Sequence, residues 1–290
     1  MAAAFWATFG PLARLLYDRG FTPLELASVR TWIALAGAGA LALATRASLR
    51  IAWRDVPFFM FYGVIAFGAF EVALLLCIER VSVPVAISLL YTSPVFVLGL
   101  ARIAFGESIP SSRRIALPLS IGGVILVTGA AGALFTAQST IPAAGLGFGL
   151  AAGFLYALFT VLGRVAIART SPATSLFWCF LFAAIALAFI ADPIRPVLRQ
   201  PDALPLLLAL GLVTTLLPYS LYLRALRLLS AGTASLLACT EPIFAAAFAA
   251  ALLDERVSPL QGLGMACIVG AALLVARPPR RPQPIRLPQG

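Results

Sequence analysis

Apolar runs of about 20 residues recur along almost the whole chain, separated by short polar breaks. Folded as a helix, such a run is long enough to cross the roughly 30 Å of hydrocarbon in a bilayer. Only 11% of the 290 residues are charged, whereas a soluble domain carries about 25%, and the mean hydropathy is +1.00. The alternating pattern of membrane barrels is missing. The sequence therefore predicts an all-α membrane protein.

Ten of these runs are expected to form membrane-spanning helices. Their approximate bounds are 2–17, 23–44, 56–78, 83–105, 115–134, 142–167, 173–191, 203–225, 231–253 and 258–276. The first run lacks the basic region and the cleavage site of a secretion signal, so we expect it to remain as a helix. Residues 277–290 are rich in Pro and Arg and are expected to form a disordered cytoplasmic tail.

An internal repeat relates residues 86–107 to residues 234–255. Adding 148 converts one stretch into the other, and the matched pairs include Thr92 and Thr240, Pro94 and Pro242, and Glu107 and Glu255. The first half, 1–137, and the second, 138–276, then hold five spans each. Because five is odd, the second half enters the membrane from the opposite side. This predicts ten transmembrane helices in two inverted-topology five-helix repeats around a central cavity.

The distribution of arginine predicts the orientation. All 21 basic residues are Arg; 14 flank the span ends on the side that holds both termini, 6 flank the other ends, and Arg30 lies inside a span. Cytoplasmic loops of membrane proteins carry the excess of positive charge. We therefore expect both termini to be cytoplasmic.

Composition also excludes several classes of function. The arginines behind the net charge of +10 lie singly or in pairs between apolar runs, a pattern that does not indicate nucleic-acid binding. The chain has no His and its four cysteines lie apart, so neither a metal site nor a cofactor is expected. No Ser–Asp or Asp–Asp pair shares one predicted depth, which argues against an intramembrane enzyme. The expected partners are a small-molecule substrate and the lipid bilayer, and a monomer is compatible with this architecture.

Three prolines interrupt predicted spans. Pro94, Pro218 and Pro242 each remove one helical hydrogen bond and free the carbonyl four residues earlier. Such carbonyls are tolerated inside a membrane where protein or a water-filled cavity surrounds them. We expect these spans to face an interior path, although kinks repaired by neighbouring Ser and Thr side chains would also account for the prolines.

Three ionisable residues lie well inside predicted spans, where a charge is costly and marks a functional candidate. Arg30 and Glu71 fall at similar depths on adjacent spans and could form a structural ion pair. Glu241, beside Pro242, has no evident partner. It could contact a substrate amine, carry a proton, or donate as a protonated carboxyl to a helix carbonyl.

Aromatic residues gather on several of these spans. A Tyr at mid-depth needs a partner for its hydroxyl, so we expect Tyr91 and Tyr156 to face an interior. Trp6 on the first span and Tyr222 on the eighth could add to an aromatic wall, which suits a partly apolar ligand or a cation.

The order of these features resembles the drug/metabolite transporter superfamily, in particular its EamA-type exporters. The residues that carry the resemblance are Arg14 in the first span, Arg30 in the second, Glu107 and Glu255 after the fourth and ninth, and Glu241–Pro242 in the ninth. Phe70–Glu71, Tyr91 ahead of Pro94, and Tyr156 are similar to YddG-type exporters of aromatic amino acids. Thr92–Ser93 and Leu155 depart from that group, because each stands where an aromatic residue is expected.

The resemblance implies a bacterial inner-membrane exporter that works by alternating access. We expect it to move small amphipathic metabolites, with aromatic or other neutral amino acids as the first candidates. The expected substrate-binding residues are Trp6, Glu71, Tyr91, Pro94, Tyr156, Tyr222, Thr240 and Glu241, and Arg30 and Pro242 are assigned structural or coupling roles. A proton-coupled exporter of cationic drugs is the alternative, and a passive channel would share the same features.

Overall fold

The computed structural model describes residues 1–81, 83–130, 142–253 and 258–276, and within these ranges all regular structure is helical. In the first half the elements are α1 (Ala2–Trp6), α2 (Phe9–Tyr17), α3 (Pro23–Ala44), η1 (Trp53–Asp55), α4 (Val56–Phe61), η2 (Tyr62–Ala69), α5 (Phe70–Ile78), α6 (Val83–Leu90), α7 (Ser93–Phe105) and α8 (Ser111–Val127). In the second half they are α10 (Ala143–Arg169), α11 (Pro172–Ala188), α12 (Arg195–Arg199), η3 (Pro201–Ala203), α13 (Leu204–Gly211), η4 (Leu212–Leu216), α14 (Leu217–Leu228), α15 (Ala231–Ala238), α16 (Glu241–Leu253) and α17 (Pro259–Ala276).

Among the described residues, seven helical segments are long and apolar enough to cross a membrane. They are Pro23–Ala44, Trp53–Ile78, Val85–Phe105, Ala143–Arg169, Pro201–Leu228, Ala231–Phe248 and Pro259–Ala276, and the shorter Pro172–Ala188 is also apolar. The chain is therefore an all-α membrane protein. The predicted tail 277–290 and the repeat residue Glu255 lie outside the described ranges.

Two predicted spans differ from the helices that form. The first, 2–17, is divided at Ala7–Thr8, where the Thr8 hydroxyl donates to the Phe5 carbonyl at 2.7 Å. The fifth was expected to begin at residue 115, but α8 begins at Ser111. Its polar first turn follows Pro110 and is helical although it is not apolar, so hydropathy alone misses it.

Local sequence accounts for several helix starts. Thr22 caps α3 in a capping box: its hydroxyl accepts from the Glu25 amide, and the Glu25 carboxylate accepts from the Thr22 amide. Ser171 and Ser230 cap α11 and α15 with a single bond each, in which the serine hydroxyl accepts from the backbone amide three residues later. One helix end is also explained by local sequence. At the C-terminus of α7, Gly106 has a φ of 64°, a left-handed conformation that ends the helix.

The helices form two compact units, each described here by itself. Unit 1 comprises Met1–Leu75 and Leu162–Arg227, and unit 2 comprises Leu76–Val161 together with the chain from Leu228 onward. Each unit thus combines helices from both sequence halves. The α10 helix runs from unit 2 into unit 1. The predicted halves 1–137 and 138–276 therefore do not coincide with the compact units.

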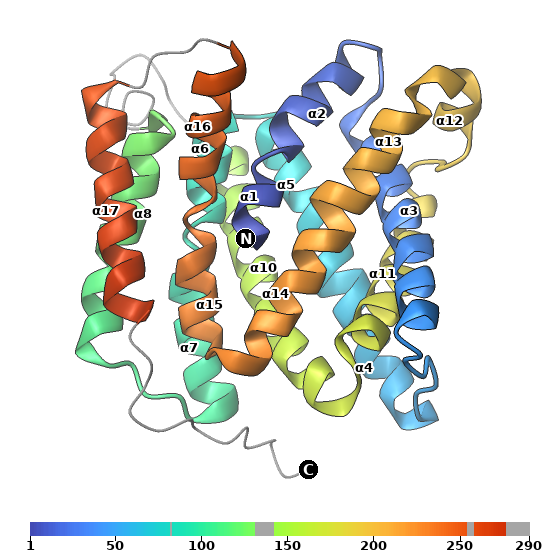
Figure 1. Cartoon of the computed structure of the whole chain (residues 1–290), viewed down its shortest axis with the longest axis horizontal. Helices are drawn as coiled ribbons and strands as arrows, with labels where there is room; N and C mark the ends of the chain where they lie inside the picture. Colours follow the sequence, from blue (N-terminus) through green and yellow to red (C-terminus); the bar gives the residue numbers. More distant parts are fainter. Residues whose placement is uncertain (82, 131–141, 254–257, 277–290) are drawn as a thin grey trace. The chain divides into compact units, whose positions relative to one another are not determined.

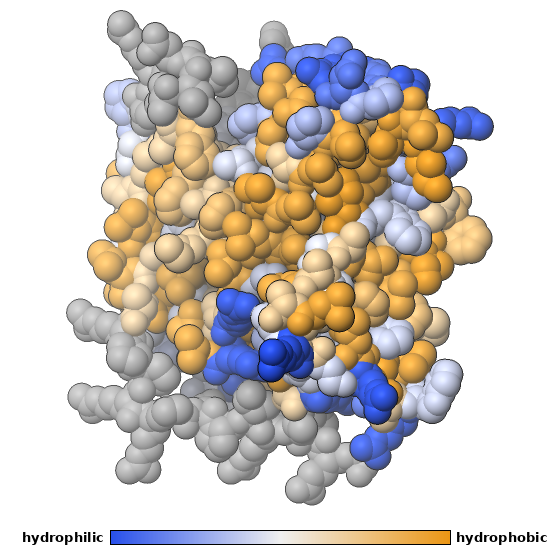
Figure 2. Space-filling view, turned by 45° about the vertical axis from the view of Figure 1, so that its right-hand side comes forward, coloured by the Kyte–Doolittle hydropathy of each residue, from blue (hydrophilic) through white to orange (hydrophobic). Residues whose placement is uncertain are grey.

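In unit 1, α3 packs against α11 and α13, and η2 packs against α11 (Figure 1). Gly211 permits the close approach of α13, since a Cβ there would meet the side chain of Ile33. The outward surface of unit 1 is a broad apolar area with hydrophilic side chains toward the helix ends (Figure 2), as expected for a surface that faces lipid.

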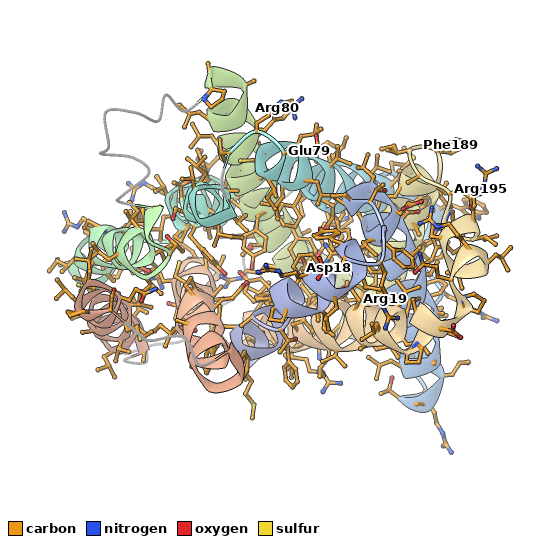
Figure 3. All side chains as sticks on the ribbon, turned by 90° about the horizontal axis from the view of Figure 1, so that it is seen from above. Asp18, Arg19, Glu79, Arg80, Phe189 and Arg195 are labelled. Carbon is orange, nitrogen blue, oxygen red and sulfur yellow. The ribbon has the colours of Figure 1, made fainter. Side chains whose placement is uncertain are left out.

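The polar turns at one end of unit 1 carry several charged residues. Figure 3 looks onto this end and shows Asp18 and Arg19 after α2 and Arg195 at the start of α12. Asp192 shapes the turn into α12, because its carboxylate accepts hydrogen bonds from the backbone amides of Ile194 and Arg195. These two bonds hold the pKa of Asp192 below its ordinary value.

In unit 2, α8 and α17 lie side by side and cross at two glycines (Figure 1). A Cβ at Gly264 would lie 2.7 Å from the Gly123 carbonyl oxygen, and a Cβ at Gly123 would lie 2.8 Å from the Gly264 carbonyl oxygen. Small residues at such a crossing let two membrane helices pack backbone to backbone.

We expect Gly264→Ala to destabilise unit 2 by about 1–3 kcal/mol, because its methyl group would press on backbone that cannot move aside. Thermal unfolding in detergent, followed with a dye that reacts with exposed thiols, measures the loss of stability. The buried thiols of Cys77 and Cys239 react with the dye only when unit 2 unfolds. Gly262→Ala, in the same helix with nothing within 4 Å of its added Cβ, is the matched control. Equal melting temperatures for both variants would contradict the prediction.

Candidate functional site

The structure distributes the ten candidate residues between the two units. Unit 1 holds Trp6, Arg30, Glu71 and Tyr222, and unit 2 holds Tyr91, Pro94, Tyr156, Thr240, Glu241 and Pro242. Within each unit, most of these residues lie together in a cluster.

The unit 2 cluster is built on two interrupted helices. The α6 helix ends at Leu90 and α7 begins at Ser93; α15 ends at Ala238 and α16 begins at Glu241. Both interruptions fall at the same place in the repeat, 148 residues apart. In each, a threonine hydroxyl donates to the carbonyl three residues earlier: Thr92 to Leu89 at 2.6 Å and Thr240 to Leu237 at 2.8 Å.

The prolines after these breaks cannot donate a backbone hydrogen bond to the carbonyls four residues earlier, those of Leu90 and Ala238. The amides that follow the prolines turn back to the threonine carbonyls, Val95 to Thr92 at 3.0 Å and Ile243 to Thr240 at 3.1 Å.

Tyr91 and Glu241 join the two breaks. The Tyr91 hydroxyl donates a hydrogen bond to Glu241 Oε2 at 2.5 Å. Tyr91 is buried and packs with Cys239 of the second break against Val124 and Ile268 of α8 and α17. The partner that the sequence failed to identify for Glu241 is thus a tyrosine at the other helix break.

The α10 helix places Tyr156 beside this pair. Tyr156 is buried, lies close enough to Tyr91 for the two phenols to interact electrostatically, and stacks on Phe159 with 6.3 Å between ring centroids. Gly153, one turn earlier, permits the approach, because a Cβ there would lie 3.0 Å from the Thr92 hydroxyl oxygen. The unit 2 cluster therefore combines one carboxylate, two phenols and the interrupted backbone of two helix breaks.

In unit 1, Arg30 and Glu71 form a buried ion pair. The sequence left this pairing open, and the structure contains it. The Arg30 guanidinium also lies over the ring of Phe9, 4.7 Å from its centroid. The carboxylate that was expected to contact substrate is thus paired with Arg30.

An aromatic cluster surrounds Tyr219 in the same unit. Its ring lies 5.3 Å from that of Trp6 and 5.2 Å from that of Phe67, and Trp6 also contacts Tyr222 at 5.5 Å. Tyr222 is thus placed with Trp6, as expected for an aromatic wall. Tyr219 was not among the predicted site residues. It lies 148 residues after Glu71, and this repeat offset is a sequence signal that could have identified it.

Helical irregularities mark both halves of unit 1 as well. The elements η2 and η4 are π-helical, and they directly precede Phe70–Glu71 and the Leu217–Tyr219 segment. Such wide turns occur mostly at functional sites and could not be read from hydropathy. Among the described residues, no group of three potential ligands could hold a metal ion.

Comparison with proteins of known sequence gives relatives of one kind. The threonine/homoserine exporter RhtA of Escherichia coli K12 is 30% identical over 217 residues, which cover 74% of this chain and 69% of that protein. The uncharacterized transporter YwfM of Bacillus subtilis is 25% identical over 97% of this chain and 93% of its own length. One crystal structure superposes with a TM-score of 0.76 over 95% of this chain and 93% of its own, at 16% identity, which shows a shared fold.

These relatives correct the narrower resemblance. RhtA is a threonine/homoserine exporter and not a YddG-type exporter of aromatic amino acids, so the comparisons support the broader EamA-type resemblance and not the narrower one. The model of the EamA-like transporter family matches residues 1–129 and 143–277. The protein is thus a multi-pass membrane transporter and not an enzyme: it belongs to the EamA-like transporter family.

Proposed function

We propose that this protein exports small amphipathic metabolites, foremost neutral amino acids, across the bacterial plasma membrane by alternating access. The observation that carries the proposal is the Tyr91–Glu241 hydrogen bond at two repeat-related helix breaks. It places a carboxylate and interrupted helix backbone together within membrane-spanning helices, which is how secondary transporters recognise charged groups of small substrates.

The proposed architecture is ten transmembrane helices in two inverted repeats, with both termini cytoplasmic. Three kinds of feature at one offset support it: the matched residues, the paired helix breaks, and the π-helical segments η2 and η4. The two ranges matched by the family model are also of nearly equal length.

In the proposed site, Glu241 receives the ammonium group of the substrate. An ammonium carries three donors and would bind the Glu241 carboxylate beside the single donor that Tyr91 supplies. The carbonyls of Leu90 and Ala238 are proposed as further acceptors, because Pro94 and Pro242 cannot donate a backbone hydrogen bond to them. Tyr156 and Tyr91 provide ring faces for the substrate side chain.

We assign the unit 1 aromatic cluster of Trp6, Tyr219 and Tyr222 a separate role in contacting apolar parts of the substrate. Two aliphatic substrates, threonine and homoserine, appear in the name of RhtA, and aromatic amino acids remain a second group to test. An exporter of cationic drugs is the competing function, because a carboxylate within the membrane could exchange protons for organic cations.

Counterflow in proteoliposomes containing only this protein tests the proposal. Vesicles are preloaded with threonine, homoserine or phenylalanine and offered the same radiolabelled compound, with and without a pH gradient. We expect saturable exchange of at least one amino acid, weakened about tenfold in Tyr91→Phe because the hydrogen bond that holds Glu241 in place is lost. Exchange of a cationic dye with a pH gradient, and of no amino acid, would favour the drug exporter instead.

A matched variant separates a local effect from a loss of folding. Tyr17 lies in unit 1, so Tyr17→Phe removes a hydroxyl of the same kind without touching the Tyr91–Glu241 bond. We expect Tyr17→Phe to exchange as the unmodified protein does.

A further inference from the structure

A groove of about 560 Å³ lies on unit 2 between α7 and α8. Its walls are Val95, Leu98, Gly99 and Arg102 of α7, Ile109 of the connecting turn, and Arg114 and Leu117 of α8. The α7 residues recur at spacings of three and four, so they form one face of that helix. None of the residues that line the groove belongs to the proposed transport site.

The groove is apolar along most of its length and positive at one end. Val95 is 45% exposed and Leu98 forms part of the wall, whereas Arg102 and Arg114 are exposed where α7 ends and α8 begins. Among the described residues neither arginine forms an ion pair. The nearby carboxylate of Glu107 is buried and engaged by Arg113 at 3.4 Å, so it does not neutralise them.

The first turn of α8 adds to the positive end. It contains no acidic residue and no side chain caps it, so the partial positive charge of the helix N-terminus remains unopposed. The neighbouring surface is apolar, with Ile103 and Ile115 84% and 58% exposed, as expected for residues that face lipid chains. By the distribution of arginine, this end lies on the predicted cytoplasmic side.

We propose that the groove binds one anionic phospholipid from the cytoplasmic leaflet. Arg102 and Arg114 bind the phosphate of the headgroup, and an acyl chain lies along Val95, Leu98 and Leu117 over Gly99. Basic pockets between transmembrane helices on the cytoplasmic side are the typical sites of such headgroups. Gly99 keeps the floor open, since a Cβ there would meet no atom within 4 Å.

Native mass spectrometry of the full-length protein, titrated with phosphatidylglycerol or phosphatidylethanolamine, tests the proposal. We expect one phosphatidylglycerol to bind in preference. In Arg102→Gln/Arg114→Gln its affinity should fall by roughly thirtyfold, about fivefold for each arginine near an anionic headgroup. The matched control is Arg54→Gln/Arg224→Gln, which removes two exposed arginines of unit 1 and should leave binding unchanged.

A second pair of variants leaves every charge in place. Gly99→Leu should fill the groove and displace the acyl chain, whereas Gly122→Leu, at another glycine with open space around it, should not. Equal lipid binding by Gly99→Leu and Gly122→Leu would overturn the proposal. So would competition by inorganic phosphate at the same concentration as the lipid, which would show a site for a free anion, or a dimer mass that Gly99→Leu alone abolishes.

Discussion

Replacing Glu241 by Gln is expected to reduce the apparent affinity for an exchanged amino acid by one to two orders of magnitude. The amide is nearly isosteric and still accepts the hydrogen bond of Tyr91, so unit 2 keeps its packing. It carries no charge, and the ammonium loses a charge-assisted bond worth about 1.5–3 kcal/mol. Counterflow rates measured over a range of external amino-acid concentrations give this loss directly.

Two controls sharpen this prediction. Glu79→Gln removes a carboxylate of unit 2 that lies in an exposed turn, and we expect no change in exchange. Tyr91→Phe keeps the Glu241 carboxylate and should lose less affinity than Glu241→Gln. If Glu241→Gln exchanged amino acids as the unmodified protein does, Glu241 would not be the ammonium site.

Removing one partner of the Arg30–Glu71 pair is expected to cost about 3–5 kcal/mol of stability, because the other charge would stay buried alone. Glu71→Leu should therefore lower the unfolding midpoint strongly, as should Arg30→Met. The double variant Arg30→Met/Glu71→Leu should recover most of the loss, since no buried charge remains. Thermal unfolding of the detergent-solubilised protein measures all three.

The exposed pair Arg80–Glu79 provides the comparison for this experiment. Its atoms are 3.5 Å apart and its side chains are 37% and 47% exposed, so breaking it should change stability by less than about 1 kcal/mol. A double variant of Arg30 and Glu71 that is less stable than either single variant would contradict the account of this pair.

Hydropathy predicted the helical character of the fold. The apolar runs locate the helical segments to within a few residues, because length and composition alone decide whether a helix can span a bilayer. Pro94 and Pro242 predicted the two breaks, since the loss of a helical hydrogen bond at proline is a local effect. Each compact unit combines helices from both halves of the chain. This arrangement depends on contacts between distant segments, so it could not be predicted from local sequence.

The candidate site was predicted in part for the same reason. Glu241 and Tyr91 were each identified because a polar or ionisable side chain is costly at membrane depth. Their hydrogen bond was not predicted, because it joins residues 150 positions apart in the chain. Tyr219 was not among the predicted site residues, because an aromatic residue within an apolar span is common and its sequence position alone does not reveal its neighbours. Its central place becomes visible only when Trp6 and Phe67 are seen to pack on it.

Competition by analogues in wild-type counterflow tests most directly the claim that the site recognises the ammonium group of an amino acid. Exchange of radiolabelled phenylalanine or threonine, whichever is faster, is measured against the amino acid, its decarboxylated amine and its deaminated hydroxy acid. The account predicts that the amino acid and the amine compete, whereas the hydroxy acid does not. Equal competition by the hydroxy acid would contradict recognition through Glu241.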